Sequence, residues 1–62
     1  MAEDAFEVLK KMLKESQNIA KTGTQQQLIN ALTAIEKYAR AHNINRFADE
    51  AKRKIASLRK NL

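Results

Sequence analysis

Apolar residues recur every three or four positions along three stretches of this chain, and each stretch predicts an amphipathic α-helix. The first stretch covers residues 3–21, about five turns, with charged and polar side chains opposite the apolar stripe. The stripe consists of Leu9, Met12, Leu13, Ser16, Ile19 and Ala20, with Phe6 and Val8 at its edges.

The same spacing continues in two further segments. Residues 25–42 place Leu28, Leu32, Ile35 and Ala39 along one line, flanked by Ala31, Tyr38 and His42 on one side and by Ile29 on the other. Residues 46–60 begin a third apolar stripe, which is narrower than the other two and has mostly small side chains in its first half. This stripe consists of Phe47, Ala48, Ala51, Ile55, Leu58 and Leu62. Both segments therefore predict helices with one buried face.

The segment between the first two predicted helices contains a helix stop followed by a helix start. Gly23 stands where a left-handed residue commonly ends a helix. Thr24 and Gln27 have the spacing of a capping box, in which each side chain accepts a hydrogen bond from the other residue's backbone amide. We therefore expect a tight, capped turn here.

The segment between the second and third predicted helices has a similar division of roles. Asn43 can adopt the left-handed conformation that ends a helix, and Ile44 can cover the open end of the core. Asn45 is a residue type favoured at the N-cap, so we expect it to start the third helix.

Links as short as these leave only adjacent, reversed packing for successive helices. The predicted fold is therefore all-α, an up-down-up antiparallel three-helix bundle that forms a single domain over residues 1–62. A chain of 62 residues can build only one small core. It contains no Pro, no Cys and a single Gly, so its stability has to come from helix packing without disulfides.

The residue types that usually carry catalysis or bind metals are sparse. The chain has no Cys and one histidine, His42, which falls in the last turn of a predicted helix, where a cation complements the helix dipole. Most of the carboxylates lie in first helical turns or stand four residues before a Lys or Arg, as Glu36 does before Arg40, and such positions stabilise helices. We therefore expect no enzymatic activity, no cofactor and no metal site.

The formal net charge is +5, and its distribution suggests one candidate site for anions. In an up-down-up bundle the end of the third helix lies near the end of the first, which carries Lys14 and Lys21. Such a positive pole fits the phosphates of a nucleic acid. Enrichment of Lys and Arg in last helical turns also follows from dipole stabilisation alone. The basic residues of the third helix that would bind phosphate are Lys52, Arg53, Lys54, Arg59 and Lys60.

The second predicted helix carries much less charge than the other two. Residues 24–42 contain three charged side chains, whereas residues 2–21 and 46–62 contain eight each. Two interpretations stay open for its outward surface, which we call the neutral face. On the first interpretation the neutral face contacts a partner protein, since the centres of interfaces are depleted of charge. On the second it is ordinary polar helix surface that needs no partner. The neutral face consists of Gln26, Asn30, Thr33, Ala34, Lys37 and Ala41.

These patterns favour a non-enzymatic helical scaffold or protein-interaction module that acts as a monomer, with nucleic-acid binding as the alternative. No segment approaches the about 18 apolar residues of a membrane span, and residues 1–11 begin acidic, so we expect a soluble protein without a membrane partner, cytoplasmic if it is natural. Helices of similar length with capped turns are typical of designed bundles, whereas Met12, Ser16 and His42 are not. Engineered and natural origins both stay open.

Two substitutions test this helical register. Leu32→Ala should cost about 2–5 kcal/mol, because it removes buried methyl groups from a small core. Ala34→Glu should leave the melting temperature nearly unchanged, because Ala34 is expected on the neutral face. Thermal unfolding followed by circular dichroism measures both effects. A large loss for Ala34→Glu, or none for Leu32→Ala, would contradict the bundle.

Overall fold

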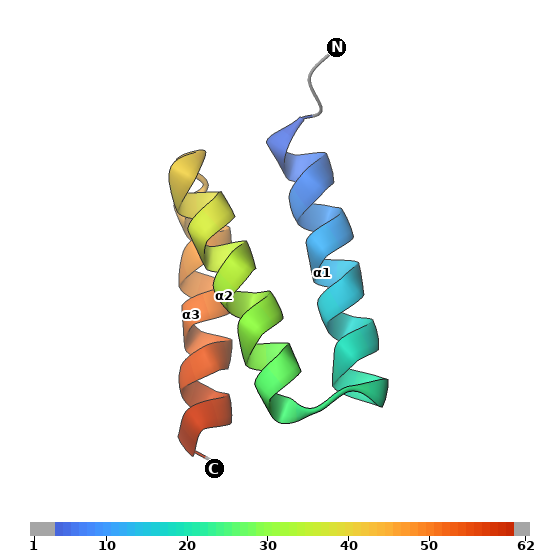
Figure 1. Ribbon diagram of the computed structural model, residues 1–62. Helices are drawn as coiled ribbons and strands as arrows, with labels where there is room; N and C mark the ends of the chain where they lie inside the picture. The colour runs from blue at the N-terminus through green and yellow to red at the C-terminus, as the bar shows by residue number, and fades with distance from the viewer. Residues whose placement is uncertain (1–3, 61–62) are drawn as a thin grey trace.

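The computed structural model describes residues 4–60, which form three α-helices and no strand: α1 (Ala5–Thr22), α2 (Gln25–Ala41) and α3 (Asn45–Lys60). The chain runs along α1, back along α2 and forward again along α3 (Figure 1). Because α1 packs against α2 and α2 against α3, the predicted all-α antiparallel three-helix bundle is confirmed. The helix ends lie within two residues of the predicted ones, a normal uncertainty for fraying termini.

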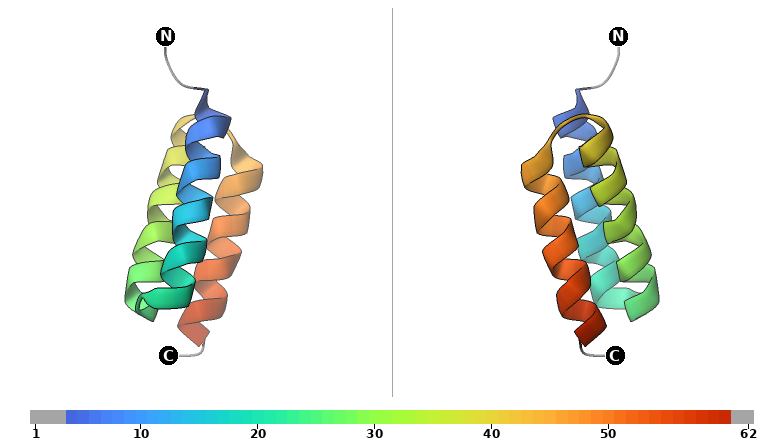
Figure 2. Two further views of the ribbon diagram at one scale, coloured as in Figure 1. Left: turned by 90° about the vertical axis from the view of Figure 1, so that its right-hand side faces the viewer. Right: turned by 90° about the vertical axis from the view of Figure 1, so that its left-hand side faces the viewer.

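The central helix is α2. Among the described residues, no Cα atom of α1 comes within 8 Å of a Cα atom of α3, so each outer helix packs its backbone only against α2. The rings of Phe6 and Phe47 still join the outer helices at one end, edge to face, with their centroids 5.8 Å apart. Figure 2 shows α1 lying alongside the pair formed by α2 and α3.

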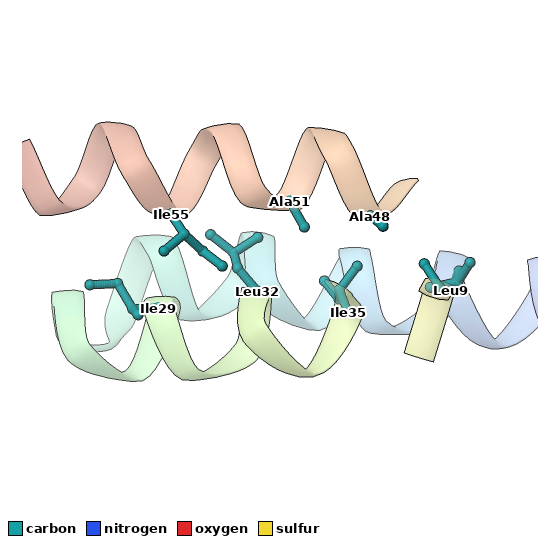
Figure 3. Packing of buried hydrophobic residues seen from close by; sticks show 8 residues of the cluster. Leu9, Ile29, Leu32, Ile35, Ala48, Ala51 and Ile55 are labelled. Carbon is teal, nitrogen blue, oxygen red and sulfur yellow. The ribbon is translucent and has the colours of Figure 1, made fainter. Parts of the chain in front are cut away.

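The core lies between the three helices, and α2 supplies the largest part of it. Ala48, Ala51 and Ile55 point from α3 toward the α2 side chains (Figure 3). The small side chains of α3 let its backbone approach α2 closely, because interaxial distance depends on side-chain size at the contact. The buried hydrophobic residues are Leu9, Ile29, Leu32, Ile35, Ala39, Ala48, Ala51 and Ile55.

The buried face of α2 is rotated slightly from its predicted position. Ile29, expected at the edge of the stripe, is only 5% exposed, whereas Leu28, expected at its centre, is half-buried. A helix packed between two neighbours needs a wider apolar arc than a single stripe. Ile29 belongs to that wider arc.

Ser16 lies in the buried stripe of α1, as the spacing predicts, and its hydroxyl has a local partner. Its Oγ donates to the carbonyl oxygen of Leu13 at 2.7 Å. A buried hydroxyl that hydrogen-bonds to the preceding turn avoids the cost of an unsatisfied polar group. The polar residue is therefore compatible with the core without help from another helix.

The turn between α1 and α2 confirms the capping box. The Thr24 hydroxyl accepts from the Gln27 amide at 3.1 Å, and Gln27 Oε1 accepts from the Thr24 amide at 3.0 Å. The left-handed conformation expected for Gly23 is wrong, because its φ of −99° and ψ of −176° are extended. Crowding accounts for the glycine instead. A Cβ atom there would lie 2.6 Å from Gln27 Oε1 and 2.9 Å from the Ile19 carbonyl oxygen.

The turn between α2 and α3 begins with a left-handed asparagine, as predicted. Asn43 has a φ of 60°. Its amide donates to the carbonyl of Arg40 at 3.1 Å, and the Ile44 amide donates to the carbonyl of Ala39 at 2.8 Å. This pair of bonds is the Schellman arrangement, which satisfies two carbonyls left free at the end of a helix.

The start of α3 differs from the prediction, and the cap of α1 is an aspartate that the sequence placed inside the first helix. Asn45 is the first residue within α3 and not its N-cap, because the carbonyl of Ile44 already accepts from the Ala48 amide at 3.3 Å. Asp4 caps α1, with Oδ1 accepting from the Phe6 amide at 3.1 Å. Glu3 and Leu62, expected within the first helix and the third stripe, lie outside the described residues.

The two asparagines of this turn should respond differently to alanine. Asn43→Ala should destabilise the bundle by about 1 kcal/mol, because alanine tolerates a left-handed conformation poorly. Asn45→Ala should change stability by less than about 0.5 kcal/mol, because Asn45 is not the cap and alanine favours a helix. Urea denaturation of both variants measures the difference. Equal losses would mean that Asn45 has a capping role after all.

Candidate functional site

The residues of the neutral face share the outward side of α2. Gln26, Asn30, Ala34, Lys37 and Ala41 are exposed, and Thr33 is half-buried. Gln26 Nε2 donates to Asn30 Oδ1 at 3.1 Å, and Thr33 Oγ1 donates to the Ile29 carbonyl oxygen at 2.8 Å. Part of the polar surface is therefore already hydrogen-bonded within α2.

An open groove of about 540 Å³ lies between α2 and α3 beside the neutral face. Its α2 wall is formed by Thr33 and Glu36, and its α3 wall by Lys52, Ile55, Ala56, Arg59 and Lys60. We call it the α2–α3 groove. Ile55 is 7% exposed and Ala56 is exposed, so apolar atoms are accessible between the charged side chains. Because Thr33 belongs to both surfaces, the neutral face and the groove are continuous.

The structure divides the basic residues that were predicted as one phosphate site. Lys52, Arg59 and Lys60 line the α2–α3 groove. Arg53 lies instead beside a smaller depression whose other lining residues include acidic side chains, and Lys54 Nζ is 4.0 Å from Glu50 Oε1. The other residues lining that depression are Arg46, Asp49 and Glu50. The groove therefore holds three of the five predicted cations, and acidic neighbours surround the other two.

Glu36 places a negative charge on the α2 wall of the groove. Arg40 donates to Glu36 Oε2 through Nε at 3.3 Å and through Nη2 at 3.2 Å, which confirms the predicted helix pair. The Glu36 side chain is 23% exposed, less than half the exposure of Arg40. Two bonds to one oxygen restrain the carboxylate. The groove thus has a basic wall on α3 and a fixed acidic group on α2.

Sequence reasoning missed the role of Gln25. Its Nε2 donates to the carbonyl oxygen of Leu58 at 2.6 Å, and so ties the start of α2 to the last turns of α3. This bond satisfies one of the carbonyls that lack a partner at a helix end. A signal was present, because Gln25 stands three and seven residues before Leu28 and Leu32 and therefore shares their face.

His42 is the C-cap of α2, one residue beyond the helix end, whereas the sequence placed it within the last turn. Its amide donates to the carbonyls of Tyr38 and Ala39 at 3.2 and 3.3 Å, and its ring lies 4.3 Å from the Tyr38 ring, centroid to centroid. The side chain is exposed at the turn. Within residues 4–60, no three His, Asp or Glu side chains are grouped closely enough to hold a metal ion.

None of the helices described for residues 4–60 combines the length and the apolar character needed to cross a lipid bilayer. No protein-family model matches the chain, and neither a curated protein nor a solved structure is significantly similar to it.

Proposed function

We propose that the protein is a non-enzymatic helical scaffold that binds a partner protein through α2, acting as a monomer. The observation that carries the proposal is the continuity of two surfaces at Thr33, the neutral face and the α2–α3 groove. Interface centres are depleted of charge, and the neutral face has one charged residue, Lys37. The groove adds the concave, partly apolar element that a flat polar helix lacks.

Side-chain size supports close approach of a partner to α2. Ala34 and Ala41 are exposed and small, so a second helix or a flat surface can come near the α2 backbone. Binding energy in interfaces concentrates where a side chain fills a pocket. Here the groove beside the neutral face is the place where a partner's side chain can be received.

The proposal includes an engineered origin as well as a natural one. Helices of 18, 17 and 16 residues joined by capped turns are the geometry recommended for designed scaffolds. The same geometry serves a natural interaction module, because in both cases a rigid core presents one helix face.

Nucleic-acid binding is the second candidate, favoured by the convergence of Lys52, Arg59 and Lys60 on one groove. Protein binding is preferred for two reasons. The α2 wall opposite the three cations adds no net positive charge, because its Glu36 is paired with Arg40, and Lys54 lies beside Glu50, so the basic surface available to phosphates is small.

Site-specific photo-crosslinking tests the protein-binding proposal. A benzoylphenylalanine at Ala34 should form a covalent adduct with one defined protein when the chain is irradiated in its producing cells. The same group at Gln17, which is exposed on α1, is the matched control and should not form that adduct. Mass spectrometry of the adducts identifies the partner. Equal labelling from both positions, or no adduct from Ala34, would count against α2 as the binding surface.

A salt titration with DNA tests the second candidate. A fluorescent 20-base-pair duplex should show no saturable binding to the protein at about 10 µM and physiological salt, because the basic surface available to phosphates is small. Anisotropy measured from low to physiological salt gives the result. Saturable binding whose affinity rises steeply as the salt concentration falls, and which is lost in the Lys52→Glu variant, would establish the nucleic-acid function instead.

A further inference from the structure

We infer that the α2–α3 groove takes an acidic amphipathic helix of the partner protein. The inference rests on the proposed protein-binding function and specifies its chemistry. Apolar side chains of the partner helix lie over Ile55 and Ala56, and its carboxylates face Lys52, Arg59 and Lys60.

Apolar contact comes from the middle of the groove. Ile55 is almost buried but still lines the groove, and Ala56 beside it is exposed. Thr33 lines the facing wall, and its hydroxyl already donates its hydrogen to the Ile29 carbonyl oxygen. Helices dock into grooves of this kind by their apolar edge. The groove therefore offers an apolar strip bordered by charge.

Charge spacing along α3 matches a helix. Lys52 and Arg59 are seven residues apart, which on an α-helix is about 10 Å along the axis. Acidic residues seven positions apart on a partner helix have the same separation and the same face. Ala56 stands between Lys52 and Arg59 on α3. It would therefore face an apolar residue of the partner helix that lies three or four positions from each of the two acids. The expected partner pattern is an acid, an apolar residue and a second acid within eight positions.

Glu36 makes the groove selective. Arg40 pairs with its carboxylate, so the α2 wall is close to neutral and attracts the partner's acids less than the basic α3 wall does. A helix can carry acids on one side and neutral or basic residues on the other, whereas a nucleic-acid strand carries charge on every phosphate. The groove is also lined by no aromatic ring among the described residues, so bases have nothing to stack on.

The test uses two fluorescein-labelled peptides of 15 residues with the same leucine stripe. One peptide carries two glutamates, seven positions apart, beside the leucine stripe. The other peptide carries lysines at the same two positions. Fluorescence anisotropy with the intact protein at about 0.15 M salt, where distant charges are screened, gives both affinities. The glutamate peptide should bind at least about tenfold more tightly than the lysine peptide.

Two double variants separate the groove from general attraction. The groove variant is Lys52→Glu with Arg59→Glu, and the matched control is Arg53→Glu with Lys54→Glu. Each replacement changes the charge by −2, so both variants fall from +5 to +1. The groove variant should lose at least about tenfold in affinity for the glutamate peptide and come to prefer the lysine peptide, whereas the control should change by less than about threefold.

Amide chemical shifts of the unmodified protein give a second readout that needs no variant to fold. The glutamate peptide should shift Thr33, Ala56 and Arg59, and leave Gln17 on α1 in place. Shifts centred elsewhere, equal losses in both double variants, or no preference for the glutamate peptide would overturn the inference. So would tighter binding of duplex DNA that the groove variant abolishes. If these results fail while Ala34 still crosslinks to a protein, only the acidic-helix chemistry is rejected; if both fail, protein binding through α2 is rejected as well.

Discussion

The position of α2 between the two outer helices is the constraint on which the rest of the structure depends. Because the backbones of α1 and α3 stay apart within residues 4–60, every close backbone contact between helices is made by α2, and α2 has to be apolar over a wide arc. That arc includes Ile29 and Ile35, and the polar residues at its edges, Gln25 and Glu36, are partly covered too. α2 has fewer exposed positions than either outer helix. Part of the low charge of α2 therefore follows from packing. Packing does not explain why exposed positions such as Asn30 and Ala34 are uncharged.

The same constraint joins the core to the candidate site. α3 approaches α2 through Ala48 and Ala51, and the groove runs along the half of α3 that follows these small residues. Ile55 takes part in both, since it is buried in the core and also lines the groove. A partner bound there would rest on the core itself. Binding and stability are thereby linked, because a ligand that binds only the folded chain also stabilises it.

Features that depend on near neighbours in the chain could be predicted from the sequence, and features that depend on helix rotation could not. The helices, the Thr24 capping box and the left-handed Asn43 rest on hydrogen bonds within a few residues. The extended Gly23 is a local exception, because its crowding comes from Ile19 and Gln27, four residues away on each side, and no sequence motif marks it. The neutral face could be placed by periodicity. The groove could not be predicted, because apolar periodicity does not show which sides of α2 and α3 face each other.

The division of the basic residues has a simple physical cause. Successive residues on an α-helix point about 100° apart, so Lys52, Arg53 and Lys54 cannot share one face even though they are consecutive in the chain. Lys52 instead shares a face with Arg59, seven positions later. A basic run in a helix is therefore a poor guide to a phosphate site, because the helix spreads it around its axis. Lys52, Arg59 and Lys60 stay together on the α3 wall of the groove, and Glu36 lies on the α2 wall. The positive charge is therefore confined to one side of the groove, which suits a partner that carries its acidic residues on one side.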